Sequence, residues 1–198
     1  MWLLVLTLGA AVLVVVVTLG SFGALSRIKI SAPWLLFVGL AFQIALEYIE
    51  LSNDQIETVG YGLLMVSYAL ILAFCLVNLP TTGFGVIAIG VGMNMLVIGL
   101  NQGMPTVPVG NDARGDRVRE PVERTVKHRP ERDDDLLGFL GDTILLPEPF
   151  DAAISFGDLV MSVGICELAY FGSRRRRGRR RRAVPRVARS RAPGTRPS

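Results

Sequence analysis

The sequence predicts an all-α membrane protein, built as a bundle of about five transmembrane helices. Two bulk properties favour this fold class: 51% of the 198 residues are hydrophobic, and the mean hydropathy is +0.44. Soluble domains rarely have a positive mean hydropathy, because their surfaces need charged side chains. The third observation is the distribution of charge, since arginines gather directly after the last apolar stretch.

Five apolar stretches have about the length that a bilayer requires. About 20 apolar residues cover a hydrocarbon core of roughly 30 Å, at about 1.5 Å per residue. The predicted helices cover about residues 2–25, 33–50, 58–79, 83–101 and 153–172. The second and fifth have short apolar runs, so their flanking residues must help them to span.

The first stretch has the position of a signal peptide but not its pattern. It lacks a positively charged start, and its apolar run is far longer than that of a normal signal peptide. We therefore expect a helix that is retained in the mature protein.

The fourth stretch is rich in glycine. Glycines let helix backbones approach closely, so this helix is expected at the centre of the bundle. The glycines concerned are Gly83, Gly85, Gly90, Gly92 and Gly99.

The charges of the chain are separated into an acidic body and a basic tail. From Arg174 to Ser198 there are twelve arginines and no acid. The rest of the chain has nine Lys or Arg against seventeen Asp or Glu, a net charge of −8. Arginine is costly inside a bilayer, and Lys and Arg favour the cytoplasmic side, so the tail is expected inside.

The short loops predict the same orientation. The first loop holds Arg27 and Lys29 and is expected inside, whereas residues 50–57 hold three acids and no base and are expected outside. Five helices, with the N-terminus outside and the C-terminus cytoplasmic, satisfy every loop. Four helices would place the first loop and the tail on opposite sides.

The predicted extracytoplasmic loop, residues 102–151, has two parts. Residues 104–135 are rich in Pro, Gly and mixed charge, a composition that cannot bury enough apolar surface to fold alone. Residues 136–150 are too short to span and too apolar for a free loop, so an interfacial or re-entrant segment is expected before the last helix. Residues 173–198 are expected to form a disordered, Arg-rich cytoplasmic tail.

Several polar residues fall within the predicted helices, where ionisable groups are costly and usually face other helices or a cavity. Glu47 follows Gln43 by four residues and Asn101 follows Asn94 by seven, so each pair shares one helix face. The fifth helix adds a polar stripe made of Ser155, Asp158 and Ser162. In the predicted topology Glu47, Asn94, Asn101 and Asp158 lie in the outer half of the membrane.

These groups and the adjoining loop predict an outward-facing site that binds a small ligand, a lipid or a partner. The candidate residues are Glu47, Asn94, Asn101, Gln102, Lys127, His128, Asp142 and Asp158. The alternative is structural, with hydrogen bonds between helices and carboxylates close enough to the interface to reach water. The sequence leaves both interpretations open.

An enzymatic alternative rests on His128, Asp142 and Asp158. Paired aspartates can share a proton and act as acid and base, which suits a membrane-embedded enzyme or a proton-coupled transporter. Gly157-Asp158 matches only a dipeptide of the intramembrane aspartyl proteases. His128 with an aspartate can carry proton chemistry or bind an anion, although a lone histidine in a charged loop is usually only solvated. No cofactor is indicated, and a single histidine is weak evidence for a metal site.

Anionic lipid headgroups are the expected partner of Arg174 to Arg182. Each Lys or Arg near an anionic leaflet contributes about 1 kcal/mol of binding free energy. Glu167, near the inner end of the fifth helix, is expected to pair with these arginines. Nucleic acid is not expected, because the run lacks interleaved aromatic residues and adjoins a membrane. The sequence does not distinguish a homo-oligomer from a complex with another membrane protein.

The loop and the last helix resemble a family of small bacterial multi-pass membrane proteins with no assigned function. The residues that carry this resemblance are Asn101 to Pro105, Lys127-His128, Leu140 to Pro147, Ser155 to Asp158 and Gly164. It covers roughly residues 1–172 and excludes the tail and residues 112–123. The resemblance implies a multi-pass protein of the bacterial plasma membrane and no catalytic residue. A non-enzymatic membrane protein is therefore the leading hypothesis.

Overall fold

The computed structural model describes residues 2–49, 55–107, 110–111, 117–118, 124–146 and 153–174. The described chain is mostly helical, which confirms the helical character predicted from the sequence. The tail from residue 175 onward lies outside the described residues.

A long helix occupies most of each of the five predicted ranges, and the last one runs one residue beyond its range. These helices are α1 (Trp2–Val17), α3 (Pro33–Tyr48), α5 (Tyr61–Val77), α6 (Phe84–Asn101) and α7 (Phe156–Ser173). The shorter helical pieces are α2 (Phe22–Leu25), the π-helical turn η1 (Ile56–Gly60) and the 3-10 turn η2 (Gly138–Leu140).

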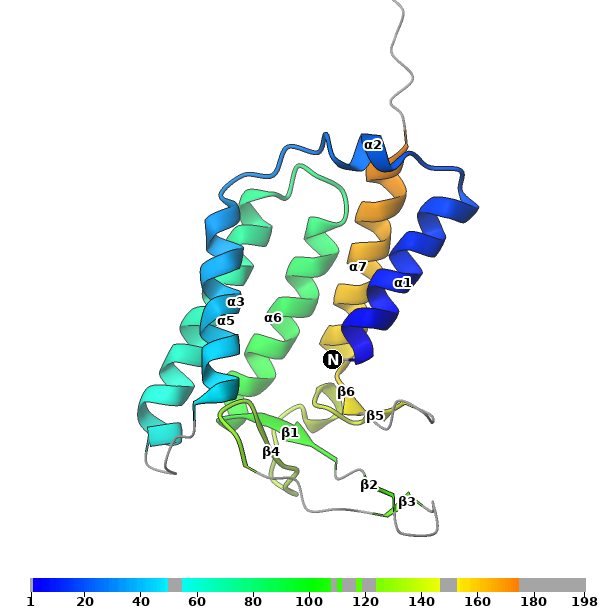
Figure 1. Ribbon diagram of the computed structural model, residues 1–198. Coiled ribbons are helices and arrows are strands. Elements are labelled where there is room, and N and C mark those ends of the chain that lie inside the picture. The colour runs from blue at the N-terminus through cyan, green and yellow to red at the C-terminus, as the bar shows by residue number, and fades with distance from the viewer. Residues whose placement is uncertain are drawn as a thin grey trace, which may run out of the picture.

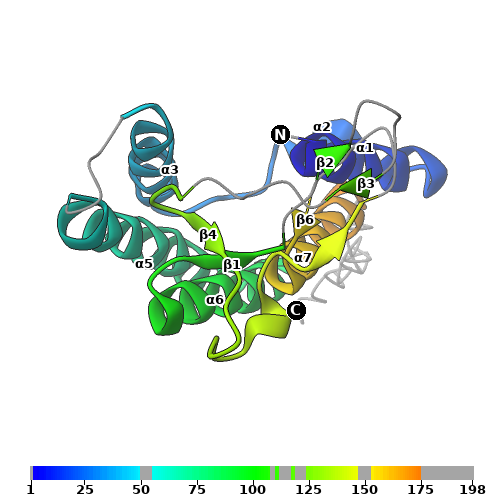
Figure 2. The same cartoon turned by 90° about the horizontal axis from the view of Figure 1, so that it is seen from below.

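The long helices run alternately in opposite directions (Figure 1). The start of α1, the end of α3 and the segment between α6 and α7 lie at one end of the molecule, the loop end. The connector between α1 and α3, the turn between α5 and α6 and the end of α7 lie at the other, the tail end. Figure 2 shows α3, α5, α6, α7 and α1 following one another along an arc, and neighbours in this order pack together. The glycine-rich helix α6 therefore lies in the middle of the arc.

Among the described residues, only α6 is long and apolar enough to cross a membrane by length and composition, with a mean hydropathy of 1.9 over 18 residues. Three other apolar segments are shorter: Val5–Val17, Pro33–Tyr48 and Tyr61–Val77. The predicted bundle of five spans therefore goes beyond what helix length and composition establish.

Two pairs of glycines bring the backbones of α6 and α7 together. A Cβ atom on Gly90 would lie 2.5 Å from the carbonyl oxygen of Gly157, and one on Gly83 would lie 2.7 Å from that of Gly164. Gly83 and Gly90 are seven residues apart, and so are Gly157 and Gly164. The close contact between the helices therefore recurs after two helical turns. Gly92 takes no part, because a Cβ atom there would meet nothing within 4 Å.

The first helix is shorter than predicted and ends at Val17 rather than near residue 25. Leu19 then adopts a left-handed conformation, with a φ of 51°. The amide of Ser21 donates a 2.8 Å hydrogen bond to the carbonyl oxygen of Ser173 at the end of α7. A Cβ atom on Gly20 would lie 2.3 Å from the hydroxyl oxygen of Ser173. The chain therefore leaves the helix where it has to pass close to α7.

The segment between α6 and α7 is folded onto the loop end of the bundle. Three two-stranded pairs form: β1 (Met104–Thr106) parallel to β4 (His128–Pro130), β2 (Gly110–Asn111) antiparallel to β3 (Arg117–Val118), and β5 (Ile144–Leu145) antiparallel to β6 (Ala153–Ile154). Met104 and Val126 are buried in one apolar cluster with Leu64 of α5 and Ile98 of α6. The described parts of this polar segment thus gain an apolar core by docking on the helices.

The apolar residues before α7 lie across the loop end, below the helices in Figure 1. Residues 136–146 form η2 and β5, and they expose Leu136, Leu137 and Phe139. The described part of the segment therefore packs on the end of the helices. Residues 147–150 lie outside the described residues.

Candidate functional site

The start of α7 is held to α6 by a buried hydrogen-bond network. The hydroxyl of Ser155 accepts a 3.0 Å hydrogen bond from the amide of Asp158, and the amide of Ser155 donates to the Asp158 carboxylate at 3.3 Å. Asn94 of α6 joins both residues: its side-chain nitrogen donates to Asp158 at 2.9 Å, and its side-chain oxygen accepts from the Ser155 hydroxyl at 3.0 Å. This reciprocal cap satisfies polar groups that would otherwise be buried without partners.

A second polar feature is a histidine–aspartate pair in the loop. Nδ1 of His128 lies 3.0 Å from Oδ2 of Asp142, and the hydroxyl of Thr106 lies 3.5 Å from the same oxygen. The side chain of Asp142 is 7% exposed, whereas that of His128 is 33% exposed. When Nδ1 carries the proton and donates it to the carboxylate, Nε2 offers a lone pair to a ligand.

Lys127 links these two features electrostatically. Tyr68 of α5 contributes most to raising the pKa of Lys127 above its usual range, and burial opposes this rise. Three carboxylates raise the pKa further: Asp158, Asp142 and Glu47. The ammonium group is therefore influenced by groups from α3, α5, the loop and α7, and it is charged at neutral pH.

The loop that carries these residues is fixed by a buried ion pair. The side chains of Arg129 and Asp135 are in direct contact and each is 4% exposed. Burial alone would raise the pKa of Asp135, but hydrogen bonds from Arg129 and from the amide of Arg132 hold it below its usual range. Nε of Arg129 also donates to the backbone carbonyl of Asn101 at 2.8 Å. The side chain of Asn101 exchanges hydrogen bonds of 2.8 and 2.9 Å with the backbone of Leu136.

The comparison with known families covers all of these residues. A family model matches residues 27–170, well over half of the chain. The chain belongs to DUF5317. This is a family of unknown function, so the resemblance to a family without an assigned function is confirmed. No curated protein and no solved structure matches the chain.

In this DUF5317 chain, five of the predicted site residues share one neighbourhood at the loop end. They are Glu47, Lys127, His128, Asp142 and Asp158, and are called here the loop-end site. Asn94 of α6 is not part of this group, but its side chain donates a hydrogen bond to Asp158. Asn101 instead anchors the loop. Gln102 is exposed and ends α6 in a left-handed conformation, with a φ of 53°.

The predicted pairing of Glu167 with the arginine tail falls mostly outside the described residues. Glu167 is partly buried on α7. The guanidinium group of Arg174 lies 4.0 Å from the ring centroid of Tyr170, and it donates to the hydroxyl group of the same residue.

Sequence reasoning missed Tyr68, Thr106 and the ion pair of Arg129 with Asp135. Tyr68 resembles any aromatic residue of an apolar helix, and Thr106 resembles any loop threonine. The ion pair lies in a stretch so rich in charge that each of its members looks solvated. No spacing in the sequence marks these four residues as neighbours of the loop-end site.

The loop-end site has a formal charge of −2 when His128 is neutral, because it holds three carboxylates and one ammonium group. Such a site attracts a small cation or a hydrogen-bond donor more readily than an anion. Among the described residues, no group of three His, Cys, Asp or Glu side chains is placed to hold a metal ion.

Proposed function

We propose that this protein is an integral multi-pass protein of the bacterial plasma membrane, with α1, α3, α5, α6 and α7 as its spans. The alternating direction of these helices supports the proposal (Figure 1). Large apolar side chains on their outer surfaces support it too, since Phe37, Ile89 and Val163 are 67%, 60% and 61% exposed. Lipid chains would cover such side chains, whereas their exposure to water would cost free energy.

We further propose that the loop end faces outside and the tail end faces the cytoplasm. Arg27 and Lys29 lie in the connector at the tail end, where the arginine-rich tail also begins. Lys and Arg in short loops favour the cytoplasmic side. The loop-end site would then be open to the extracytoplasmic solution.

The biochemical function that we propose is the binding of a small cationic ligand at the loop-end site. One observation carries this proposal: three carboxylates from distant parts of the chain, Glu47, Asp142 and Asp158, lie near enough to Lys127 to influence its ammonium group electrostatically, at a loop fixed by a buried ion pair. A fixed polar site with unbalanced charge is a suitable receptor for a ligand of opposite sign, because little ordering is needed on binding.

The structural interpretation accounts for only part of this arrangement. It explains Asn94, Ser155 and Asp158, whose hydrogen bonds cap α7 and join it to α6. It does not explain why a buried Asp142 orients a partly exposed His128. Asp142 and His128 are therefore the residues to substitute in a test of the proposal.

The experiment is a titration of the full chain in nanodiscs with ethylammonium, choline and putrescine, with acetate as the anionic control. The thermal midpoint should rise with at least one amine and not with acetate. Asp142→Asn should weaken that binding by about 10–100-fold, the effect of losing one charge-assisted hydrogen bond. Asp133→Asn removes the same charge from an exposed position of the same loop and should bind as the wild type does. A rise with acetate alone, or no rise with any amine, would refute cation binding.

An acid–base activity is the second candidate, favoured by the orientation of His128 by Asp142. Buried aspartates hold catalytic histidines in one tautomer in the same manner. Asp142 and Asp158 have separate partners, His128 and Asn94, so His128 with Asp142 is a better acid–base pair than the two aspartates together. Complementation of a deletion strain distinguishes the candidates. Loss of function by both His128→Gln and Asp142→Asn at unchanged protein level, together with wild-type amine binding by His128→Gln, would favour acid–base chemistry.

A further inference from the structure

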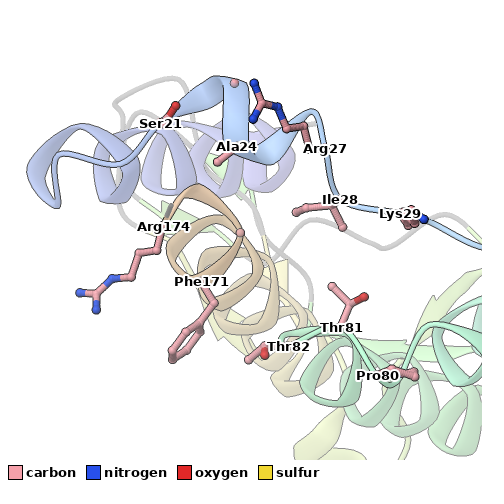
Figure 3. A pocket seen from close by; sticks show the side chains of 12 residues that line it. Ser21, Ala24, Arg27, Ile28, Lys29, Pro80, Thr81, Thr82, Phe171 and Arg174 are labelled. Atoms are coloured by element: carbon pink, nitrogen blue, oxygen red, sulfur yellow. The ribbon is translucent and has the colours of Figure 1, made fainter. Parts of the chain in front are cut away.

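A large cavity opens at the tail end, opposite the loop-end site. It has a volume of about 980 Å³. Figure 3 shows its three walls: the connector between α1 and α3, the turn between α5 and α6, and the last turn of α7. No residue of the loop-end site lines it, so its role is separate from the function proposed above.

Basic residues dominate the charge of this cavity. Arg27, Lys29 and Arg174 line it, and none of the described lining residues is acidic. Within the part of the chain that the structure describes, no carboxylate lies within ion-pair distance of Arg27 or Lys29. The guanidinium group of Arg174 is engaged with Tyr170, so Arg27 and Lys29 create the positive potential that concentrates anions here.

The cavity also supplies hydrogen-bond donors and an apolar wall. Its lining residues include Ser21, Thr81 and Thr82, whose side chains carry hydroxyl groups. Ile28 and Phe171 add apolar surface, and the side chain of Phe171 is half exposed on α7. An anion with an attached hydrocarbon chain matches both kinds of surface.

The walls are tied together by hydrogen bonds, so the cavity exists before any ligand binds. The buried side chain of Asn78, at the end of α5, accepts a 2.7 Å hydrogen bond from the amide of Ser31 and donates one of 2.9 Å to its carbonyl oxygen. On the other side, the amide of Ser21 donates to the carbonyl of Ser173. The connector that carries Arg27 and Lys29 is thus held at both edges, and binding need not order it.

We propose that this cavity is a binding site for a phosphate group, supplied by an anionic lipid headgroup or by a small phosphorylated molecule. Arg27 and Lys29 provide the charge, and Thr81 and Thr82 provide neutral donors. Guanidinium, ammonium and hydroxyl groups are the donors that recognise phosphate elsewhere in proteins.

The test uses the full chain in an uncharged detergent, titrated with dihexanoyl phosphatidylglycerol, dihexanoyl phosphatidylcholine and inorganic phosphate. Phosphatidylglycerol should bind and phosphatidylcholine should not. If inorganic phosphate binds as tightly as phosphatidylglycerol, the ligand is a free phosphate compound. If only the lipid binds, the ligand is a headgroup with its chains.

Two variants separate the cavity from the arginine tail. Arg27→Gln with Lys29→Gln should weaken binding about 30-fold, since each cation near an anionic surface contributes about 1 kcal/mol. Arg179→Gln with Arg180→Gln removes equal charge from the arginine-rich tail and should bind as the wild type does. Ala24→Trp fills the cavity without changing any charge, so it should also abolish binding even if the basic pair affects membrane insertion.

Three outcomes would overturn the proposal: no binding of either phosphate probe to the wild type, full binding by both cavity variants, or loss of binding only in the tail variant. His128→Gln and Asp142→Asn should leave phosphate binding unchanged. Failure of this inference therefore says nothing against cation binding at the loop end.

Discussion

At the residue scale, Arg129 and Asp135 show how a charged loop becomes a fixed part of the molecule. Each side chain is 4% exposed, and each would be strongly disfavoured without the other. Removing one partner of a buried pair leaves an uncompensated charge, which costs about 3–5 kcal/mol. The pair also holds His128 and Lys127 in place, because all four residues belong to the same docked loop.

Asp135→Asn should therefore loosen the loop without unfolding the helices. Hydrogen exchange of the Met104 amide, which donates to the Lys127 carbonyl at 2.7 Å, should accelerate about 100-fold, as a loss of about 3 kcal/mol implies. Asp134→Asn changes an exposed carboxylate next to it and should leave this exchange rate unchanged.

The same pair predicts an acid-sensitive loop. The pKa of Asp135 is lower in the folded protein than in the unfolded chain, where it is about 3.9. Its stabilising contribution is therefore present above about pH 4 and is lost as the pH falls through the lower folded value. Protection of the Met104 amide in the wild type should decline in this range. Asp135→Asn should already lack that protection and should show no such decline.

Lys127 gives the opposite pH dependence. Its folded pKa is raised, chiefly by the phenolate of Tyr68, which forms only at alkaline pH, and further by three carboxylates, against the effect of burial. The stabilising contribution of the carboxylates is present below about pH 10.4 and is lost as the pH rises through the folded value. Lys127→Met should lower the thermal midpoint at neutral pH, because the nearby carboxylates lose the attraction of its ammonium group. The midpoint of the variant should change less than that of the wild type between neutral and strongly alkaline pH. Arg132→Met, at an exposed position of the loop, is the control.

At the element scale, the sequence predicted the helices well and the loop poorly. Apolar runs placed a long helix in each of the five ranges, because burial and lipid exposure both need such runs. The end of α1 near Val17 was missed, since the chain carries no charged residue before Arg27 to mark it. The strands were missed because two or three residues cannot show an alternating pattern.

For the candidate site, the sequence predicted individual residues but not the contacts between them. Asp158 and Asn94 could be found because polar residues in apolar helices are rare and usually face inward. Their contact with one another could not be found, because it depends on the register of α6 against α7. That register is set by the glycine pairs, Gly83 with Gly164 and Gly90 with Gly157.

The packing of α6 on α7 provides an element-scale prediction with a control two residues away. Gly90→Ala places a Cβ atom 2.5 Å from the Gly157 carbonyl oxygen and should destabilise the protein by about 1–3 kcal/mol. Gly92→Ala meets nothing within 4 Å and should be neutral, or stabilising by up to about 1 kcal/mol, since alanine is the better helix former. Thermal or denaturant unfolding in detergent measures both. Equal effects of the two substitutions would contradict the close helix contact.

At the scale of the whole molecule, charge and chemistry are divided between the two ends. The tail end carries a basic cavity and continues into the arginine-rich tail, whereas the loop end carries a site with a formal charge of −2. A bundle with an odd number of membrane spans separates its termini in this way, and one with an even number does not. The separation is consistent with lipid contact at one end and ligand binding at the other.

The five-span arrangement can be tested on the whole molecule by labelling. In a background of Cys75→Ala and Cys166→Ala, single cysteines at Gly115 and Gly194 should react with a membrane-impermeant maleimide from opposite sides. Gly115→Cys should label in intact cells, because its loop is proposed to face outside. Gly194→Cys should label only after permeabilisation, because arginine-rich segments stay in the cytoplasm. The parent without cysteines should not label. Labelling of both positions from the same side would require an even number of spans, and the loop-end site would then face the same compartment as the tail.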